Sequence, residues 1–500
     1  MTVPLLQGRR TSPVTVNEGL AIAAILAASG ALRALCIDWQ GLWNNELITW
    51  RAVGQDWGVL IRERVSRNHM PLYFLMLKAW TMIAGSSEAA LRAPSAVFGV
   101  AGLGLLWIVG RTMLSPATGL AAAGLGALHQ QWVAMSFDAR MYVHVMAFSL
   151  AGVWTAWRWF TTGRQRHAVA HGAVMVAGLA THLLLVTVPV ALLLTMLRRG
   201  RPWRLCLRHA VPVAVPVLLL IPLMWWWSQV QYKVGRDDWQ VPSGGRLIRN
   251  SLVTVFGDYE VAGADGKDAV RAAGYVLVAL SAAATITWRR RRMWGRERLD
   301  EGQRVAHGLL LWVAVLPPLT GYLAGFRTPS ALDSARYLAV TTSVTPLLLA
   351  AAWVAFSLAW ARWAALGLSA ALLAVHTGFH LEDEGDGLRE AMEWLRGRTF
   401  EGRVAVACSS DAAVLAFPYY GVTMPVVPLP RAERDPDVIR AICREAAKAG
   451  TERLYLFRYR AGDSPALEVM REETPWLEHL DTERFGLCRI NAFEVREAGP

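Results

Sequence analysis

The feature that most constrains this sequence is a series of apolar blocks, each close to the length that crosses a lipid bilayer. Of the 500 residues, 54% are hydrophobic and only 18% are charged, whereas soluble domains usually carry about a quarter of charged residues. A segment in hydrocarbon must satisfy its own backbone hydrogen bonds, so each block of roughly 20 residues is predicted to form a helix. The sequence therefore predicts an α-helical polytopic membrane protein with about eleven spans and additional interfacial helices.

Two places make the span assignment less direct. The segment 71–86 is short and carries Lys78 near its middle, so we interpret it as an interfacial or re-entrant helix. The blocks 167–181 and 183–197 favour a hairpin that turns at residues 181–182, with a single tilted helix as the alternative. The predicted spans are 19–37, 93–110, 117–135, 141–160, 167–181, 183–197, 209–228, 271–288, 305–325, 338–358 and 362–379.

The positive charges indicate orientation. Basic clusters at 164–166, 198–204 and 289–298 each lie between two apolar blocks, as in the short cytoplasmic loops of membrane proteins. They account for much of the formal net charge of +12 without nucleic acid, because no basic surface with interleaved aromatic residues lies outside a membrane block. The N-terminus is predicted to be cytoplasmic, with membrane lipids as surroundings. The stretches predicted to face the extracytosolic side are 38–92, 136–140, 229–270, 326–337 and everything after residue 380.

The character of the chain changes after residue 380. Residues 1–380 are predicted to form the transmembrane domain, with a first extracytosolic loop at 38–92, and residues 381–500 a small soluble extracytosolic α/β domain. The charged residues 382–386 are interpreted as a solvated linker, and the cysteines of the tail are compatible with one disulfide. The elements expected in the tail are an amphipathic helix at 388–396, a strand at 403–408, a helix at 435–449 and a strand at 452–459.

Candidate catalytic residues begin in the first loop. Glu46 follows Asn45 just outside the first span, where a partly buried carboxylate is suited to act as a general base. The alternative is that Glu46 caps a helix or forms a surface pair. Asn68 and His69 stand at a second polar-to-apolar junction, where His69 could bind a phosphate or a metal, or could simply be an interfacial histidine.

The short turn near residue 138 and the start of the span at 338 offer further candidates. Asp138 and Arg140 are costly at the hydrocarbon edge unless they are paired or used. Arg140 can anchor a phosphate through two hydrogen bonds, and Tyr142 follows it; a structural Asp138–Arg140 pair is the alternative. Arg336 and Tyr337 are candidates for a lipid phosphate, although an arginine at a helix end can also merely reach toward the interface. Arg92 and His182 have weaker claims.

These motifs, in this order, resemble the GT-C glycosyltransferases, in particular bacterial relatives of the dolichyl-phosphate-mannose protein mannosyltransferases and of the lipid A aminoarabinose transferases. The resemblance covers about residues 40–160 well and the later spans only by pattern. The residues that carry it are Trp43-Asn44-Asn45-Glu46, Asn68-His69-Met70-Pro71-Leu72-Tyr73, Ser87-Glu88-Ala89-Ala90-Leu91-Arg92-Ala93-Pro94-Ser95-Ala96, Gly110-Arg111 and Asp138-Ala139-Arg140-Met141-Tyr142.

The resemblance implies an enzyme of the bacterial cytoplasmic (inner) membrane and cell envelope. It would move a sugar from a polyprenyl-phosphate donor, with inversion, to an extracytosolic lipid, polysaccharide or protein. Glu46 and Asp138 would be the catalytic pair; His69, Arg140, Tyr142, Arg336 and Tyr337 would bind the donor phosphate, and Asn45 and Asn68 would lie in the acceptor loop. The family's first-loop aspartate falls on Asn45, and Asn68 stands near another acidic position of the family. An amide is a poor base and a poor metal ligand, so the sequence implies no cofactor and supports no bound divalent metal.

Two other functions compete with this one. The replacement of acids by Asn45 and Asn68 favours a diverged, non-catalytic relative that binds a lipid-linked glycan or scaffolds a glycan-assembly complex. A transporter would need inverted repeats or acidic residues at the middle of the membrane, and the sequence shows neither, because its charges gather at the ends of the blocks.

Overall fold

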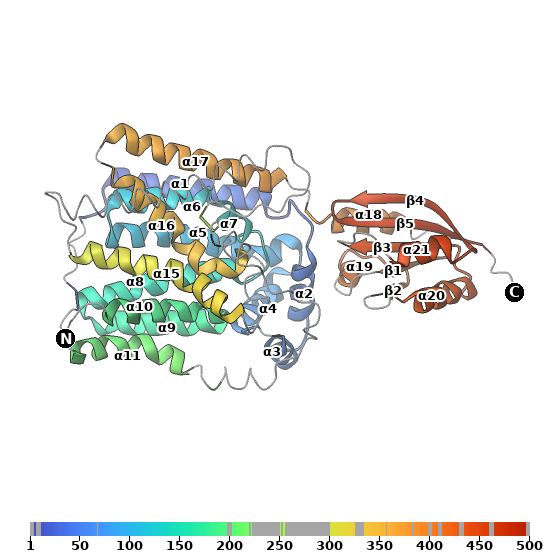
Figure 1. The fold of residues 1–500 in the computed structure, drawn as a ribbon, viewed down its shortest axis with the longest axis horizontal. Coiled ribbons are helices and arrows are strands. Elements are labelled where there is room, and N and C mark those ends of the chain that lie inside the picture. Colours follow the sequence, from blue (N-terminus) through green and yellow to red (C-terminus); the bar gives the residue numbers. More distant parts are fainter. Residues whose placement is uncertain are drawn as a thin grey trace. The chain divides into compact units, whose positions relative to one another are not determined.

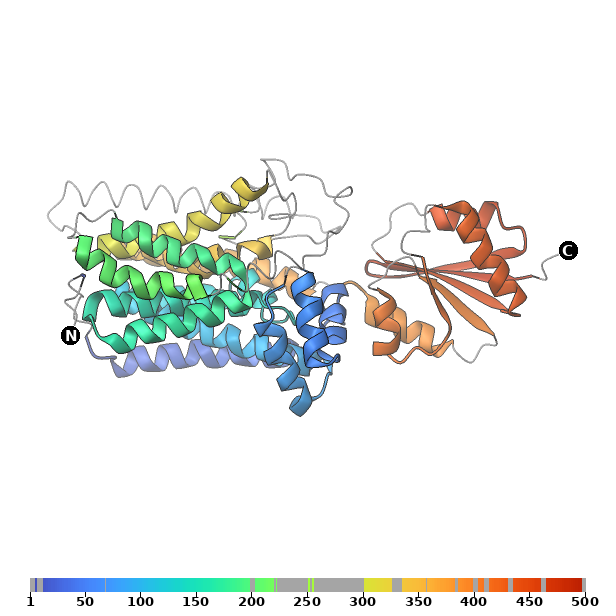
Figure 2. The ribbon, with the colours of Figure 1, turned by 90° about the horizontal axis from the view of Figure 1, so that it is seen from below.

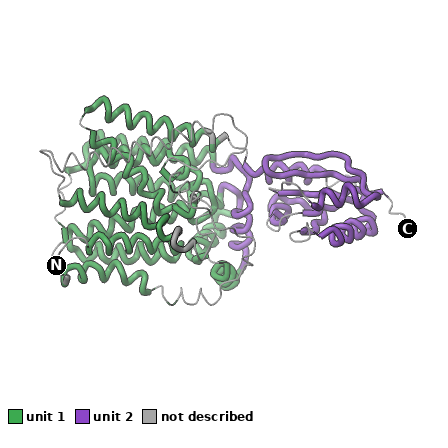
Figure 3. Tube along the Cα trace, viewed as in Figure 1, with its two compact units in different colours: residues 1–36, 56–85, 90–382 green, residues 37–55, 86–89, 383–500 purple. Residues whose placement is uncertain are grey.

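The computed structural model describes residues 5–6, 12–67, 69–197, 203–219, 222, 251, 254–255, 301–325, 335–356, 358–382, 385–398, 403–408, 413–429, 435–459 and 465–496. The chain divides into two compact units (Figure 3). The first, here called the helical unit, comprises Met1–Cys36, Asp56–Gly85 and Ala90–Glu382. The second, here called the mixed unit, comprises Ile37–Gln55, Ser86–Ala89 and Asp383–Pro500. Two pieces of the predicted first loop thus group with the C-terminal residues.

The helical unit is a bundle in which the long helices run side by side (Figures 1 and 2). Its core is made of apolar side chains from most of these helices, with Trp132 and Trp159 among the largest buried ones. The helices are α1 (Val16–Cys36), α3 (Trp57–Ser66), α4 (Leu72–Ala84), α5 (Glu88–Met113), α6 (Pro116–Ala127), α7 (Gln130–Ala134), α8 (Tyr142–Thr162), α9 (Gln165–Thr181), α10 (Thr187–Leu197), α11 (Trp203–Leu219), α15 (Glu301–Gly325), α16 (Ala339–Val354) and α17 (Ala359–Glu382).

Most predicted spans coincide with helices, and one is wrong as a continuous helix. The predicted helix over 117–135 is interrupted, because α6 ends at Ala127 and α7 begins at Gln130. Between them the His129 ring accepts a hydrogen bond from the backbone N–H of Gln131 at 3.2 Å and so caps the new helix. The separation of α9 and α10 at residues 182–186 agrees with the predicted break there. The predicted span 271–288 and loop 229–270 lie outside the described residues, apart from isolated positions.

Length and hydropathy support a membrane location. Three described helical segments are long and apolar enough to cross a bilayer, namely Val16–Cys36, Glu88–Met113 and Arg336–Val354. Two shorter apolar helical segments, Leu72–Ala84 and Leu183–Leu197, accompany them. The first of these is the segment predicted to be interfacial, and the ammonium nitrogen of its Lys78 lies 5.2 Å from the centroid of the Trp57 ring. The total of about eleven spans stays a prediction.

Glycines let α5 and α6 approach closely. A Cβ atom added at Gly110 would lie 2.7 Å from Cα of Gly119, and one added at Gly119 would lie 2.5 Å from the Trp107 carbonyl oxygen. A buried ion pair ties α1 to α5 nearby: Arg111 Nε and Glu18 Oε1 are 2.7 Å apart, and both side chains are less than a tenth exposed. Small residues at helix contacts and paired charges are the arrangement expected inside a membrane bundle.

The mixed unit contains a five-stranded sheet in the order β2-β1-β3-β5-β4. Strand β1 pairs in parallel with both β2 and β3, whereas β5 pairs antiparallel with both β3 and β4. The strands are β1 (Val404–Cys408), β2 (Val426–Pro428), β3 (Arg453–Tyr459), β4 (Leu477–Phe485) and β5 (Cys488–Val495), and the helices of this unit are α2 (Asn44–Val53), α18 (Leu388–Gly397), α19 (Ala416–Tyr419), α20 (Pro436–Lys448) and α21 (Pro465–Glu472).

Helices cover both faces of the sheet, which explains why every residue of β1 is buried (Figure 2). Leu454 and Leu456 of β3 belong to the core that includes Ile439 of α20 and Val469 of α21. The intervening Tyr455 points to the other face, where its ring centroid lies 5.6 Å from that of Trp394 in α18. The predicted small α/β domain is thereby confirmed.

Three details of the tail differ from the sequence-based expectations. Asp386 does not lie in a purely solvated linker, because its carboxylate accepts a hydrogen bond from the Tyr459 hydroxyl and its carbonyl oxygen accepts one from the Leu487 N–H at 3.1 Å. The expected elements are present, but β2, β4, β5, α19 and α21 had no counterpart in the expectation. All five cysteines are free thiols, so the disulfide considered for the tail does not form.

A glycine substitution should destabilise the mixed unit. Gly387 precedes α18 with φ +71°, and an added Cβ would lie 2.1 Å from the backbone carbonyl oxygen of Phe485. Gly387→Ala should therefore cost more than the ~1–2 kcal/mol of the left-handed backbone alone, seen as a lower thermal unfolding midpoint of the full chain. Gly421→Ala is the matched control, since Gly421 has the same φ with no atom within 4 Å of an added Cβ. Equal losses in the two variants would contradict the predicted backbone clash.

Candidate functional site

A buried arginine marks the end of α3 in the helical unit. Leu60, Arg64 and Val65 form the buried side of this helix, and Arg64 is 1% exposed. Its Nη2 donates to Glu63 Oε1 at 2.7 Å, and its guanidinium carbon lies 5.4 Å from the centroid of the Phe74 ring. The other two nitrogens, Nε and Nη1, are buried and have no hydrogen-bond partner among the residues that the structure describes. Buried N–H groups of this kind are normally satisfied, so they indicate a place for an acceptor.

His69 lies next to this arginine, before α4. Its backbone N–H donates to the Arg64 carbonyl oxygen at 2.9 Å. Burial holds the pKa of His69 well below its usual range, and the positive charges of Arg140 and Arg64 lower it further. The imidazole is therefore neutral near pH 7, so it can donate one hydrogen bond but does not add a charge.

The predicted turn before α8 brings a second arginine to the same place. Arg140 is 4% exposed, and its backbone N–H donates to the Asp138 carbonyl oxygen at 2.7 Å. The Tyr142 hydroxyl is hydrogen-bonded to the Arg140 side chain, and Asp138 is close enough to act on it electrostatically. Tyr73 of α4 also interacts with Arg140. Asp138 therefore acts on Arg140, as the alternative of a structural pair expects, whereas the binding of a phosphate by Arg140 stays a prediction.

The short 3-10 turn Ala335–Leu338, just before α16, completes the arrangement. The rings of Tyr142 and Tyr337 are 6.2 Å apart between centroids and nearly perpendicular, at 81°. Arg336 acts electrostatically on Tyr142. The centroid of the His182 ring lies 6.3 Å from that of Tyr142, and His182 Nδ1 accepts a hydrogen bond from the Leu184 N–H. Tyr142 therefore interacts with both Arg140 and Arg336, which come from separate segments of the chain.

The helical unit thus gathers five basic side chains, here called the basic cluster: Arg64, His69, Arg140, His182 and Arg336. The sequence predicted three of them as phosphate-binding residues, and the structure brings these three together. It also adds Arg64, which the sequence reasoning missed, and His182, to which it gave a weaker claim. The available signal for Arg64 was its spacing of four residues from Leu60, which places both on one helical face.

Two of the predicted residues of the first loop belong to the other unit. Asn45 and Glu46 belong to α2 of the mixed unit, and Glu46 is fully buried. Glu46 Oε2 accepts a hydrogen bond from the backbone N–H of Trp43 at 3.3 Å, as expected of an acidic residue in the first turn of a helix. Glu46 therefore caps a helix, which was one of its two predicted roles. Asn68 is outside the described residues.

Comparison with known proteins decides the fold. A family profile described as dolichyl-phosphate-mannose-protein mannosyltransferase matches residues 68–227. The crystal structure of the Archaeoglobus fulgidus oligosaccharyltransferase in the apo form is 13% identical and superposes with a TM-score of 0.53, covering 88% of this chain and 69% of that one. The chain has a GT-C fold. This confirms the resemblance inferred from the spaced motifs.

Two further solved structures resemble this chain. The archaeal oligosaccharyltransferase AglB from Archaeoglobus fulgidus, in complex with an inhibitory peptide and a dolichol-phosphate, is 12% identical, with a TM-score of 0.52 over 88% of this chain and 70% of that one. ArnT from Cupriavidus metallidurans in the apo state is 12% identical, with a TM-score of 0.48 over 97% of this chain and 100% of that one. No curated protein sequence matches the chain.

The described part of the chain offers no ready metal site. Among these residues, no group of three or more His, Cys, Asp or Glu side chains is placed to hold a metal ion. The basic cluster is suited to an anion instead, because guanidinium groups donate two hydrogen bonds to a phosphate and carry a fixed positive charge.

The neutral state of His69 predicts a pH dependence of stability. Since its pKa is lower in the folded chain than in the unfolded one, unfolding takes up a proton below about pH 6.5. The contribution of His69 is therefore constant above that pH and becomes destabilising as the pH falls toward 5. We expect the thermal midpoint to drop less between pH 7 and pH 5 in His69→Gln than in the wild type. Equal drops in both proteins would contradict the assignment.

Proposed function

We propose that this protein is a membrane glycosyltransferase that moves a sugar from a polyprenyl-phosphate donor to a hydroxyl acceptor, with inversion. The observation that carries the proposal is the basic cluster, in which Arg64 keeps two buried nitrogens available to an acceptor. The carboxylates of Glu63 and Asp138 offset part of the charge of the three arginines. A buried site that keeps a surplus of positive charge calls for an anionic ligand. A lipid phosphate supplies that anion next to the apolar helices of this fold.

The relatives support the same ligand class. The family profile is named for enzymes that use dolichyl-phosphate mannose, and it covers α4 to α11. The structure of the archaeal oligosaccharyltransferase holds a dolichol-phosphate. We therefore assign the donor phosphate to Arg64, Arg140 and Arg336, with His69, Tyr142 and Tyr337 as neutral hydrogen-bonding or aromatic neighbours.

The proposed reaction is a single displacement at the anomeric carbon of the donor sugar. The acceptor oxygen attacks the anomeric carbon as the bond from that carbon to the phosphate oxygen breaks, and polyprenyl phosphate leaves with the bonding electrons. The acceptor proton passes to a carboxylate, assigned to Glu46, and is then lost to water. Arg140 stabilises the phosphate charge, and Asp138 holds Arg140 in position. The chemistry is proposed to occur on the extracytosolic side of a bacterial cytoplasmic membrane.

A second function follows from one residue. Asn45 stands where the resembling enzymes carry an aspartate, and an amide cannot accept a proton. A diverged relative that only binds a lipid-linked glycan would keep the basic cluster and lack turnover.

Transfer and binding should be measured on the same preparation. The full-length protein in nanodiscs is incubated with polyprenyl-phosphate mannose and with matched hexose and pentose donors, together with a candidate hydroxyl acceptor. Release of polyprenyl phosphate that depends on the acceptor supports the enzyme. Saturable binding of polyprenyl phosphate without transfer, and turnover gained in Asn45→Asp, would favour the diverged relative. Absence of polyprenyl-phosphate binding would overturn both functions.

A further inference from the structure

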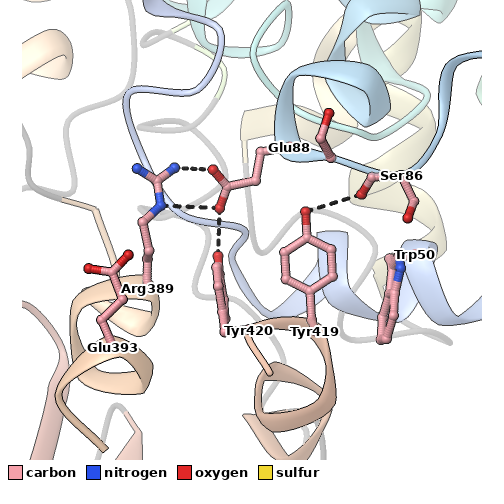
Figure 4. A pocket seen from close by; sticks show the side chains of 8 residues that line it. Trp50, Ser86, Glu88, Arg389, Glu393, Tyr419 and Tyr420 are labelled. Carbon is pink, nitrogen blue, oxygen red and sulfur yellow. Dashed lines mark hydrogen bonds and ion pairs between the residues drawn. The ribbon is translucent and has the colours of Figure 1, made fainter. Parts of the chain in front are cut away.

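The mixed unit contains a pocket that the basic cluster does not involve (Figure 4). It is open to the surface, has a volume of about 500 Å³, and is lined by Trp50 of α2, by Ser86, Ser87 and Glu88, by Arg389 and Glu393 of α18, and by Tyr419 and Tyr420 at the end of α19. This volume is within the range of small-molecule sites. The residues come from three separate parts of the sequence, and all of them belong to the mixed unit.

One wall of the pocket is aromatic. The ring centroids of Trp50 and Tyr419 are 5.0 Å apart with an interplanar angle of 78°, and Tyr419 and Tyr420 meet edge to face at 4.8 Å. The Tyr419 hydroxyl donates to the Ser86 carbonyl oxygen at 3.2 Å. These contacts hold flat apolar faces in fixed orientations, so that a ligand can stack without first ordering the side chains.

The opposite wall is a closed polar network. Arg389 forms an ion pair with Glu88, and Tyr420 donates to Glu88 Oε1 at 2.7 Å (Figure 4). The Tyr420 hydroxyl in turn accepts the Leu42 backbone N–H at 2.8 Å, and Arg389 Nη2 donates to the Asp38 carbonyl oxygen at 2.7 Å. Burial and the Glu88 carboxylate raise the pKa of Tyr420, so its hydroxyl keeps its proton and remains a donor.

A glycine allows the first loop to approach this network. A Cβ added at Gly41 would lie 2.8 Å from Cβ of Arg389 and 3.0 Å from the Tyr420 hydroxyl oxygen. The close approach lets Leu42 reach Tyr420. The geometry of the pocket therefore depends on Gly41, which does not itself line the pocket.

The charge of the lining selects among ligands. The Glu88 charge is compensated by Arg389. Glu393 is exposed, and its carboxylate forms no hydrogen bond or ion pair with another described residue. Glu393 follows Arg389 by one helical turn on α18 and lines the same pocket. The lining is thus negative overall, which disfavours carboxylate and phosphate ligands and favours neutral or amine-bearing ones.

From the aromatic wall and the surplus carboxylate we infer that this pocket binds a pyranose ring that is neutral or carries an amine, as the acceptor saccharide. A pyranose presents an apolar C–H face that can stack on Trp50 and Tyr419, and a rim of hydroxyls that can hydrogen-bond to Glu393 and the serines. The role as acceptor site rests on the proposed function, whereas the binding of the saccharide does not.

The test uses three probes that share one ring. Methyl glucopyranoside, its 2-amino analogue and the corresponding methyl glucuronide are titrated against the full-length protein in a detergent without sugar groups, and binding is followed by saturation-transfer NMR. We expect the amino sugar to bind most tightly and the glucuronide most weakly.

Two variants test the lining. Trp50→Ala should lower the affinity for the amino and neutral sugars about tenfold through loss of the stacking surface. Glu393→Gln should remove about a threefold preference for the amine.

Glu390→Gln is the matched control, because it removes the same charge from an exposed position of α18 outside the lining, and its affinities should equal those of the wild type. Binding of the glucuronide as tight as that of the amino sugar, or affinities unaffected by both Trp50→Ala and Glu393→Gln, would overturn the inference. Arg140→Ala separates the two proposals: it should lower the rate of transfer by about two to three orders of magnitude and leave sugar binding unchanged. Sugar binding without transfer in the wild type would count against the proposed function alone.

Discussion

Replacing Arg140 with alanine is expected to lower the rate of sugar transfer by about two to three orders of magnitude. Its side chain is buried, and Tyr142 and Asp138 hold it beside the other basic groups of the cluster. The leaving phosphate gains negative charge as the bond to the sugar breaks, so a fixed guanidinium stabilises the transition state more than it stabilises the bound donor. The loss should therefore appear mainly in kcat, measured as initial rates of polyprenyl phosphate release at saturating donor.

Arg64→Met should act in the same direction, because methionine keeps much of the apolar stem and removes the two nitrogens that lack partners among the described residues. Arg67→Gln is the control. It removes a positive charge from the end of the same helix, where the Arg67 side chain is 58% exposed and pairs with Glu63 at 3.4 Å, so it should change the rate less than about twofold. Equal losses in the Arg64 and Arg67 variants would show that general positive charge matters and not the buried site. Normal kcat in Arg140→Ala would contradict the donor assignment.

The features that could be predicted from the sequence are helices set by the length of an apolar block or by the regular spacing of apolar residues. The first apolar block predicted a helix at 19–37, and α1 covers Val16–Cys36. The strongly amphipathic stretch after the last span became α18, with Leu388, Ala391, Met392 and Leu395 on its buried face. In each case a local pattern sets the structure, because burial of one face, or of the whole helix, follows directly from the spacing of apolar residues.

The features that the sequence did not reveal depend on distant partners. The outer strand β4 carries charged residues and has a single buried residue, so it resembles a loop until β5 pairs with it. Arg64 stands in a run of charges that normally indicates a solvated helix face. Its burial is decided by the packing of α3 against α4 and by the Phe74 ring, neither of which the spacing of charges encodes. The same holds for Glu88, whose partners Arg389 and Tyr420 lie about 300 residues away.

Replacing Glu46 with glutamine is expected to lower transfer by about two to four orders of magnitude, because the amide cannot accept the proton of the acceptor hydroxyl. This substitution separates catalysis from structure. Glutamine serves in the first helical turn as glutamate does, so its side-chain oxygen can still accept the Trp43 N–H that Glu46 binds now. The thermal unfolding midpoint should therefore remain close to that of the wild type, whereas Glu46→Ala should lose activity and about 1 kcal/mol of stability together.

Asp138→Asn provides the comparison that assigns the base. Asp138 interacts with Arg140 and lies half-buried in the turn before α8, so its loss should weaken the positioning of that guanidinium and reduce kcat less than Glu46→Gln does. A supporting role and a base also differ in their pH profiles. The rising limb of kcat against pH should disappear when the base is removed and persist when only Arg140 is less well positioned. If Glu46→Gln keeps full activity and Asp138→Asn loses the rising limb, the base is Asp138 and Glu46 is only the cap of α2.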